Sequence, residues 1–284
     1  MFYITGIAGF VGSNLANRMS SIGMEVSGCD NLKFGVKDNT FVPFEVKDFD
    51  QVKLSKDDVL IHCACDNIIY GIEYPVETFK TNALKSIELF RRFNGRIVYL
   101  STSSIYGQAS TLPTPESHPH NVYNAYDQSK LIAELFLKQR GNYTTLRLSN
   151  VYGVNQRPSN PYAGVIGKFV GLAKSGFSLP INGSGSQTRD YTHVDDVVDA
   201  IIRACLTISL ETEINIGTGV ETSVMDIALM VSDLSEVQVV SIPERPIDKI
   251  HRRCLDISKA DALLDWHPTI SVKEGIEMLW KNYK

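Results

Sequence analysis

The chain has 284 residues with a formal net charge of −4, and 43% of its residues are hydrophobic. This is typical of a soluble globular enzyme built as one large α/β unit or as two lobes. It lacks the basic excess that binds nucleic acid and any apolar run long enough to span a membrane, so neither partner is expected. The chain enters a strand-like run directly, without a leader, which predicts a cytoplasmic protein.

Strand-like and helix-like runs alternate through the first half of the chain. In order they are a strand ending before Gly6, a helix at 10–19, strands at 24–29 and 59–61, a helix at 76–93, a strand at 96–100, a helix at 123–139 and a strand at 143–148. Strands separated by helices predict parallel βαβ units in a doubly wound α/β sheet. Ligands of such sheets lie at the carboxyl ends of the strands.

The second half is less regular. A loop is predicted at 158–161 and a turn at 182–186, with helices at 195–206, 223–232, 258–264 and 272–280. The boundary between the two lobes is expected near residue 150. Strand-like runs occur on both sides of it, so the chain is expected to return to the same sheet after entering the second lobe.

The five cysteines give no sign of a disulfide framework or of a metal site. Cys29 and Cys63 fall in predicted core strands, and the spacing of Cys63 and Cys65 is wrong for a zinc knuckle or a redox pair. We therefore expect buried free thiols and no bound metal.

Three glycines stand at the spacing G-x-x-G-x-x-G where the first strand turns into the first helix. Such a turn directs backbone amides at a phosphate, and glycine lets the backbone approach it. The triplet alone also fits an ordinary tight turn, but Asp30 ends the next strand, about where an acid that binds a ribose belongs. The residues expected at a dinucleotide are Gly6, Gly9, Phe10, Val11, Gly12 and Asp30.

A candidate catalytic set is formed by Thr102, Tyr126 and Lys130. The tyrosine and the lysine are four residues apart on one face of a predicted helix. A free tyrosine, with a pKa of about 10, is a poor base at neutral pH. A neighbouring ammonium, together with the positive nicotinamide ring of a bound dinucleotide, would favour its phenolate and lower the pKa toward about 7. The Thr102 hydroxyl, at a strand end, can bond the oxygen whose proton Tyr126 removes. The Y-x-x-x-K pattern also arises by chance on helix surfaces; the hydroxyl cluster upstream favours the catalytic interpretation.

This set, following the glycine turn, resembles that of the extended short-chain dehydrogenase/reductases. The chain is identified as a member of their NAD-dependent epimerase/dehydratase family, and its motifs are similar to those of UDP-glucose 4-epimerase-like members over nearly its whole length. These motifs are D-N-L-x-x-G at 30–35, I-H-C-A at 61–64, Pro75 and Asn82, R-L-S-N-V-Y-G at 147–153, G-S-Q-T-R-D-Y at 185–191 and R-P-x-D at 245–248.

The resemblance implies a Rossmann fold with an NAD-binding domain over residues 1–150, to which the chain returns from its second half. Residues 151–284 are expected to form mainly a smaller, mixed lobe that binds the nucleotide sugar. A carboxylate at Asp30 would repel the 2′-phosphate of NADP, so the cofactor is predicted to be NAD.

The resemblance also implies which residues contact the ligands. Besides the glycine turn and Asp30, the cofactor is expected to contact Asn31, Glu45, Val46, Ala64, Asn82, Tyr126 and Lys130. The sugar nucleotide is expected to contact Thr102, Ser103, Asn150, Arg189 and Arg245. In the family the two arginines clamp the diphosphate, since a guanidinium fork binds phosphate oxygens in pairs. The alternative for each arginine is a surface ion pair.

The reaction is suggested by Ser103 and Ser104. Dehydratases and decarboxylases of the family carry a carboxylate at this strand end, because elimination needs a base there. With serines in these places, Tyr126 is the only base the sequence indicates, which favours hydride removal and return at C4 of a UDP-hexose. A reductase, an epimerase acting at C3 or C5 and a catalytically silent dinucleotide sensor remain alternatives, and the hexose itself stays open.

The helices at 76–93 and 123–139 carry more apolar residues than one face of a sheet would bury. In similar enzymes these two helices pair across a two-fold axis into a four-helix bundle, so a homodimer is expected. The alternative is that both helices simply pack on the sheet.

Overall fold

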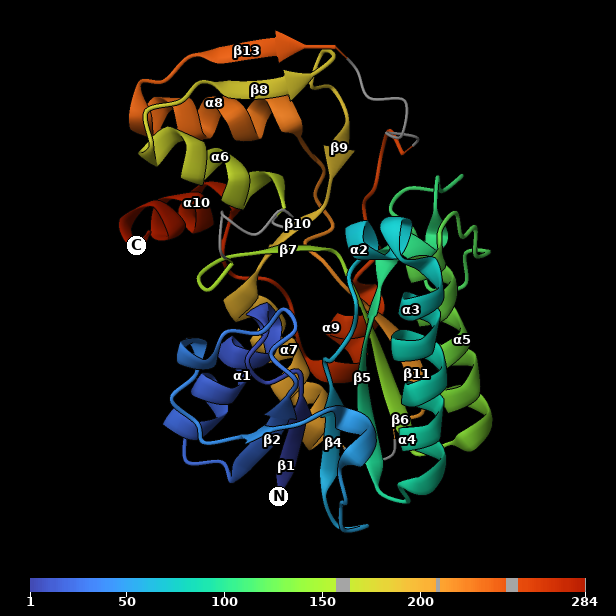
Figure 1. The fold of residues 1–284 in the computed structure, drawn as a ribbon. Helices are drawn as coiled ribbons and strands as arrows, with labels where there is room; N and C mark the ends of the chain where they lie inside the picture. Colours follow the sequence, from blue (N-terminus) through green and yellow to red (C-terminus); the bar gives the residue numbers. More distant parts are fainter. Residues whose placement is uncertain (157–163, 208–209, 244–249, 284) are drawn as a thin grey trace.

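A seven-stranded parallel sheet forms the centre of the protein, seen in a computed structural model that describes residues 1–156, 164–207, 210–243 and 250–283 (Figure 1). The strand order is β11-β6-β5-β4-β1-β2-β3, which is the doubly wound Rossmann arrangement predicted. The strands are β1 (Phe2–Thr5), β2 (Val26–Asp30), β3 (Glu45–Val46), β4 (Val59–His62), β5 (Arg96–Thr102), β6 (Tyr143–Leu148) and β11 (Thr212–Ile216).

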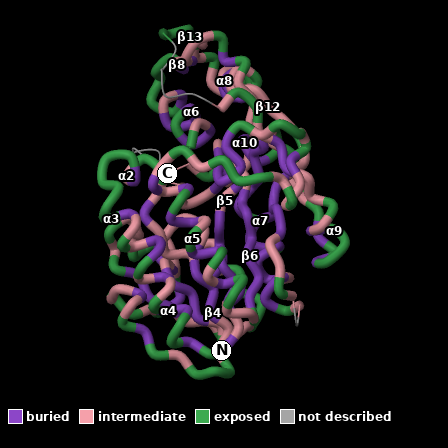
Figure 2. Tube along the Cα trace, turned by 90° about the vertical axis from the view of Figure 1, so that its right-hand side faces the viewer, coloured by how far each residue is buried: buried purple, intermediate pink, exposed green. Residues whose placement is uncertain are grey.

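Helices cover both faces of this sheet, and each face has its own apolar core. On one face lie α1 (Phe10–Ser21), α7 (Val194–Leu206) and α9 (Ser258–Leu264). On the other lie α3 (Pro75–Phe79), η3 (Lys80–Lys85), α4 (Ser86–Arg92) and α5 (Ala125–Arg140). Because both faces are covered, the central strands are buried (Figure 2), which explains their near-continuous apolar runs.

One predicted helix is less regular than expected. The sequence predicts a single helix at 76–93, and the chain instead forms α3, a π-helical turn in η3, and α4 in continuous succession. The wider turn contains the buried Asn82, whose polar side chain bonds outside the helix. Such π turns are frequent beside functional sites.

The second lobe lies beyond the carboxyl ends of the strands and has a separate core (Figure 1). Its main elements are α6 (Val165–Lys174), β8 (Leu179–Asn182), α8 (Val224–Ser235), β13 (Val239–Ile242) and α10 (Val272–Lys281). Both α8 and α10 begin with a capping box, at Ser223 and Ser271, which fixes where these helices start. The loop predicted at 158–161 lies outside the described residues.

The chain crosses between the lobes more than once. The short strands β7 (Asn150–Tyr152) and β10 (Tyr191–His193) pair in parallel at the junction, and β9 (Thr188–Arg189) pairs with β12 (Thr222–Ser223) nearby. From the second half, β11 adds to the sheet beside β6 in register, with Ile214 opposite Leu146. Among the described residues no helix is long and apolar enough to cross a membrane.

Candidate active site

The glycine turn between β1 and α1 has the close backbone approach that its sequence predicted. Gly6 adopts a φ of +71°, and a Cβ on Gly12 would lie 2.1 Å from the Gly6 carbonyl oxygen. Gly9 is the N-cap of α1 and no side chain caps this helix. The first amides of α1 therefore keep their hydrogen-bonding capacity for an anion, as the diphosphate of a dinucleotide requires.

Asp30 lies at the carboxyl end of β2 and is nearly fully buried. Its carboxylate accepts hydrogen bonds from the Ala8 amide at 3.0 Å and from the Leu32 amide at 2.7 Å. Burial raises the pKa of this carboxyl group, and the two amides oppose the rise. The residues around the turn thus form a cradle that suits the adenosine half of NAD.

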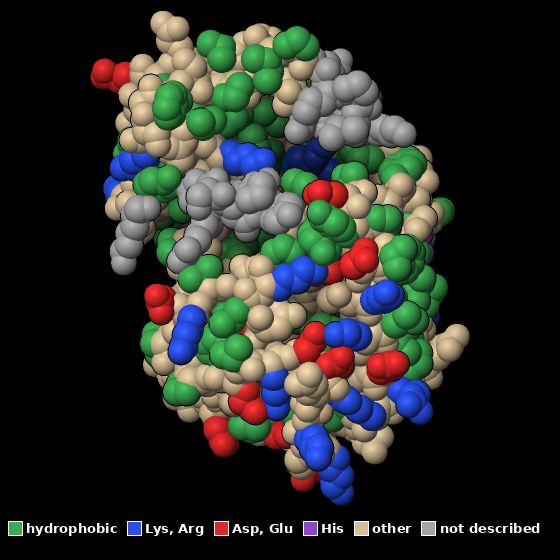
Figure 3. All heavy atoms as spheres, viewed as in Figure 1, with side chains coloured by type: hydrophobic (Ala, Val, Ile, Leu, Met, Phe, Trp, Pro, Cys, Tyr) green, Lys and Arg blue, Asp and Glu red, His purple; other side chains and the backbone are tan. Residues whose placement is uncertain are grey.

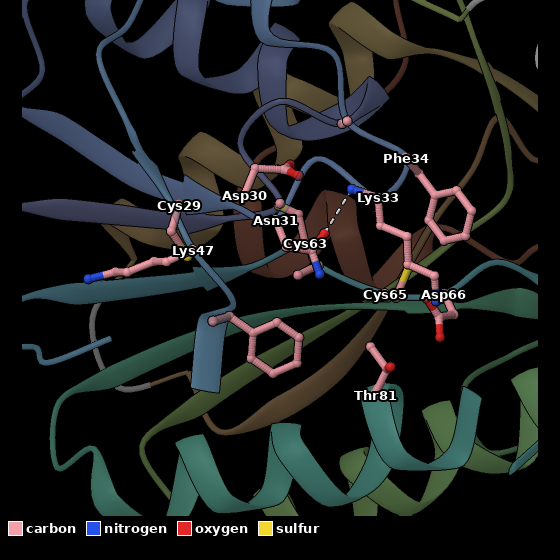
Figure 4. Close-up of a pocket in the computed structure, with 15 residues that line it drawn as sticks. Cys29, Asp30, Asn31, Lys33, Phe34, Lys47, Cys63, Cys65, Asp66 and Thr81 are labelled. Atoms are coloured by element: carbon pink, nitrogen blue, oxygen red, sulfur yellow. Dashed lines mark hydrogen bonds and ion pairs between the residues drawn. The ribbon is translucent and has the colours of Figure 1, made fainter. Parts of the chain in front are cut away.

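Two adjoining hollows of about 90 and 530 Å³ run along the carboxyl ends of the strands. Figure 4 shows the smaller one, between Asp30 and the loop after β4. Of the predicted cofactor residues, those lining one or both hollows are Gly6, Gly9, Phe10, Val11, Gly12, Asp30, Asn31, Ala64, Tyr126 and Lys130. The structure therefore brings together most of the residues that the sequence assigned to the cofactor.

Three predicted cofactor residues do not line these hollows. Glu45 and Val46 are exposed on β3, where Glu45 pairs with Lys47 at 2.8 Å. Asn82 uses both ends of its carboxamide on the backbone of Asp66, at 2.7 and 2.9 Å. In this position Asn82 holds the loop that follows β4.

Lys33 lines both hollows. Its ammonium lies 2.7 Å from a carboxylate oxygen of Asp66 and 3.8 Å from the ring centroid of Tyr70. Figure 4 shows its side chain running from the loop after β2 toward Asp66. These contacts join the two loops that border the pocket.

Tyr126 and Lys130 come together on α5, which begins at its N-cap Asn124. Lys130 is 2% exposed; its ammonium donates to the Leu100 carbonyl and lies 4.3 Å from the ring centroid of Tyr99. Burial lowers the pKa of Lys130. The buried lysine is thus held between β5 and the pocket that Tyr126 also lines.

Burial opposes the lowering of the Tyr126 pKa that a neighbouring ammonium and a bound nicotinamide ring would cause. Burial raises the pKa of Tyr126 well above its usual value, because a phenolate there loses its hydration. A hydrogen bond with Thr102 and the nearby charge of Arg253 oppose this rise. Ionising Tyr126 therefore depends on hydrogen-bond partners and on positive charge beyond Lys130.

Asp127 is a site residue that sequence reasoning missed. Its buried carboxylate accepts a hydrogen bond from the Ser104 hydroxyl, which lies 2.9 Å from the Thr102 hydroxyl. The carboxylate thus comes from α5 and not from the strand end, where the sequence shows only serines. Its position directly after Tyr126 was the signal available, since neighbours on a helix N-terminus can both face the end of β5.

Arg253 was also missed, because it lies over a hundred residues from the catalytic set. Its charge acts on both Tyr126 and Asp127, and burial lowers its pKa to about 10. Its Nε is buried and has no hydrogen-bond partner among the described residues. Arg253 therefore brings a positive charge close to both Tyr126 and Asp127.

The predicted substrate residues lie on the side of the second lobe. Ser103 is buried in η4 (Ser103–Tyr106), directly after Thr102. Asn150, on β7, has a buried side-chain oxygen without a partner among the described residues. Arg189 donates to the Thr188 and Ile250 carbonyls at 2.7 and 2.9 Å. Arg245 lies outside the described residues.

The sequence model of the NAD dependent epimerase/dehydratase family matches residues 2–217. The chain belongs to this family. The match confirms the family predicted from the motifs and, with it, NAD as the cofactor. Within the described residues there is no cluster of side chains that could hold a metal ion.

The similar proteins that carry a name differ in the activity that the name gives. The chain is 35% identical to a Methanocaldococcus jannaschii protein provisionally named UDP-glucose 4-epimerase, covering 98% of this chain and 96% of that one. It is 32% identical to UDP-glucose 4-epimerase of Mycolicibacterium smegmatis, covering 96% and 95%. It is also 31% identical to UDP-glucuronic acid decarboxylase 3 of Arabidopsis thaliana, covering 99% and 88%. The comparisons support an enzyme of this family without distinguishing epimerase from decarboxylase.

Among solved structures, UDP-glucose 4-epimerase of Thermotoga maritima in complex with UDP-glucose superposes with a TM-score of 0.93. It is 28% identical, and the match covers 99% of this chain and 98% of that one. The similarity extends over both lobes, so this family member shares the whole architecture and not the sheet alone.

Proposed function

We propose that this protein is a UDP-hexose 4-epimerase that acts through a transient 4-keto sugar. The observation that carries the proposal is the arrangement of Tyr126: it lines the large pocket together with the buried Lys130, which lies one turn further along the same helix. The two epimerase relatives at 35% and 32% identity support the same activity.

In this mechanism Tyr126 removes the proton of the sugar 4-hydroxyl and later returns it. Bound NAD supplies the acceptor and donor of the C4 hydride. Thr102 hydrogen-bonds the reacting oxygen, and Arg253 supplies positive charge near a phenolate at Tyr126. Lys130, one turn further along α5, adds a second positive charge on the same side of the helix. The oxygen on C4 stays on the sugar in both the alcohol and the ketone form. The same base can therefore remove the proton of this oxygen and later return it.

The glycine turn and Asp30 would hold the dinucleotide, and Asn150 and Arg189, on short strands near the junction of the lobes, would contact the nucleotide sugar. A planar guanidinium such as that of Arg189 suits a diphosphate, which needs paired hydrogen bonds from one side chain. The serines at 103 and 104 favour epimerisation over elimination, because neither supplies a carboxylate from the strand end itself.

The test is to incubate the protein with UDP-glucose or UDP-galactose in deuterated water, with no added cofactor. Interconversion without deuterium in the product supports the proposal, since hydride return to C4 exchanges nothing with solvent. Deuterium at C3 or C5 of the product would overturn the proposal and indicate an epimerase that acts at that carbon. Turnover only with added reduced cofactor would indicate a reductase. No turnover of any UDP-hexose, with NAD bound, would indicate a sensor.

We also propose that two copies pair through α5 and the helices beside it. Apolar side chains are exposed on α2 (Ile68–Glu73), α3, η3 and α5, and these elements contact one another. They include Ile72, Val76, Leu84, Ile132 and Leu135. Figure 3 shows hydrophobic side chains gathered along the edge of the molecule that α3 and α5 form. A patch of this kind marks an interaction surface, and a second copy would complete a four-helix bundle.

A further inference from the structure

The smaller hollow, which suits the adenosine half of NAD, is lined by charged side chains of both signs. Asp30 and Asp66 are the carboxylates, and Lys33 and Lys47 are the cations. NADP differs from NAD by a phosphate on the adenosine ribose, and a free ammonium beside that ribose would bind this strongly anionic group. The two lysines are therefore the side chains that could counteract the preference for NAD set by Asp30.

Asp66 holds Lys33 by an ion pair (Figure 4). The ammonium nitrogen of Lys33 lies 2.7 Å from Oδ1 of Asp66 and 3.8 Å from the ring centroid of Tyr70. Burial lowers the pKa of Lys33, but the hydrogen bond with Asp66 more than reverses this, and the pKa lies above its usual value. The ammonium is thus charged, and it is already occupied by a carboxylate.

Asp66 is fixed by contacts that do not involve the lysine. Its backbone N–H donates to the side-chain oxygen of Asn82 at 2.7 Å, and its carbonyl accepts from the side-chain nitrogen of Asn82 at 2.9 Å. The Asp66 side chain is 2% exposed, and Oδ2 is buried without a hydrogen-bond partner among the described residues. A buried carboxylate is costly unless it is paired, so Asp66 strongly favours keeping the Lys33 ammonium.

The second lysine of the hollow is held less firmly. Lys47 lies 2.8 Å from Oε2 of Glu45, whose side chain is 58% exposed. An exposed ion pair contributes little, because water competes for both charges. The two pairs therefore differ in burial while having the same chemistry, which makes Glu45 a matched control for Asp66.

We infer that Asp66 selects NAD over NADP by keeping the Lys33 ammonium away from the place of a 2′-phosphate. Asp66 is thus a positioning residue that acts through Lys33, whereas Asp30 acts on the ribose directly. Without the charge of Asp66, the ammonium would be free to turn toward a phosphate beside Asp30, which belongs to the same chain segment. The inference concerns the cofactor and does not depend on which sugar reaction the protein catalyses.

The test measures how well NAD and NADP displace NADH from the loaded protein, followed by the fluorescence of bound NADH. The readout is the ratio of the two displacing concentrations, because a general loosening of the pocket weakens both nucleotides alike. Asp66→Asn keeps the shape of the side chain and removes its charge. We expect the preference of this variant for NAD to fall about tenfold, as for the gain of one hydrogen bond to a charged group. Glu45→Gln should change the preference little.

Lys33→Met shows whether Asp66 acts through the lysine. In the wild type Lys33 is held, so Lys33→Met alone should leave the preference for NAD unchanged or raise it, since it frees the charge of Asp66. The double variant lacks both charges of the pair and offers no ammonium at this position. Its preference should return from the low value of Asp66→Asn toward that of the wild type.

Several results would overturn the inference. One is an unchanged preference in Asp66→Asn. Another is a selective loss of NADP binding in Lys33→Met, which would show that the ammonium already serves the phosphate in the wild type. An equal fall on removing Asp66 with and without Lys33 would assign the selection to the charge of Asp66 itself. Thermal unfolding shows whether each variant is folded, and Lys33→Met alone still decides if Asp66→Asn is not.

Discussion

Lys33 and Asp66 form an ion pair that joins the two loops bordering the cofactor pocket, with 2.7 Å between Nζ and Oδ1. Lys33 comes from the loop after β2, and Asp66, which is nearly fully buried, from the loop after β4. The ammonium also lies over the Tyr70 ring. Because Lys33 and Asp66 also line the pocket, this contact lies beside the place where a dinucleotide would bind.

The first prediction follows from this contact. Lys33→Ala removes both the ion pair and the cation–π contact, each of which contributes roughly 0.5–1 kcal/mol at a partly exposed site. Release of NAD should become about tenfold faster, measured by dilution of the loaded protein and fluorescence of the freed nucleotide. Lys37→Ala, an exposed lysine of the same segment, is the matched control. Equal release rates for the two variants would show that the contact does not retain the cofactor.

A second prediction concerns the choice between NAD and NADP. Nucleotide released by heating the purified protein should be NAD, and titration of the stripped protein should show weaker binding of NADP. Asp30→Asn preserves the shape of the side chain but removes the charge that repels a 2′-phosphate. This variant should bind NAD about tenfold more weakly and lose much of its discrimination. Unchanged discrimination would mean that another residue selects the cofactor.

The third prediction tests the base. Tyr126→Phe keeps the ring and should leave folding and NAD binding intact, while turnover of a UDP-hexose falls by about two to four orders of magnitude. Thr102→Val should cost less, because it removes one hydrogen bond and leaves the base in place. The two variants are compared by their steady-state rates at saturating substrate. A greater loss in Thr102→Val would show that the threonine does more than hydrogen-bond the reacting oxygen.

The fourth prediction concerns assembly. Leu135 on α5 is 50% exposed in the single chain, and a glutamate there would be buried in a four-helix bundle. Light scattering should give a dimer mass for the wild type and a monomer mass for Leu135→Glu. Leu229→Glu changes a similarly exposed leucine on α8, in the other lobe, and should remain dimeric. A monomeric wild type at micromolar concentration would reject the dimer.

The sequence determined those features that depend on residues close together in the chain. The spacing of Gly6, Gly9 and Gly12 specified the turn, because a Cβ on Gly12 would meet the backbone of Gly6. The alternation of apolar strands and amphipathic helices specified the parallel sheet. The separation of Tyr126 and Lys130 by one helical turn placed both on the same side of α5.

The tertiary structure alone decided how charges from distant elements meet at the tyrosine. Nothing in the spacing of Ser104, Asp127 and Arg253 shows that a strand end, a helix N-terminus and the segment before α9 converge there. Burial is likewise set by packing, and it raises the pKa of Tyr126, an effect that the residues near Tyr126 in the sequence do not reveal. Desolvation depends on every atom around a group, and a short-range sequence pattern carries no record of those atoms.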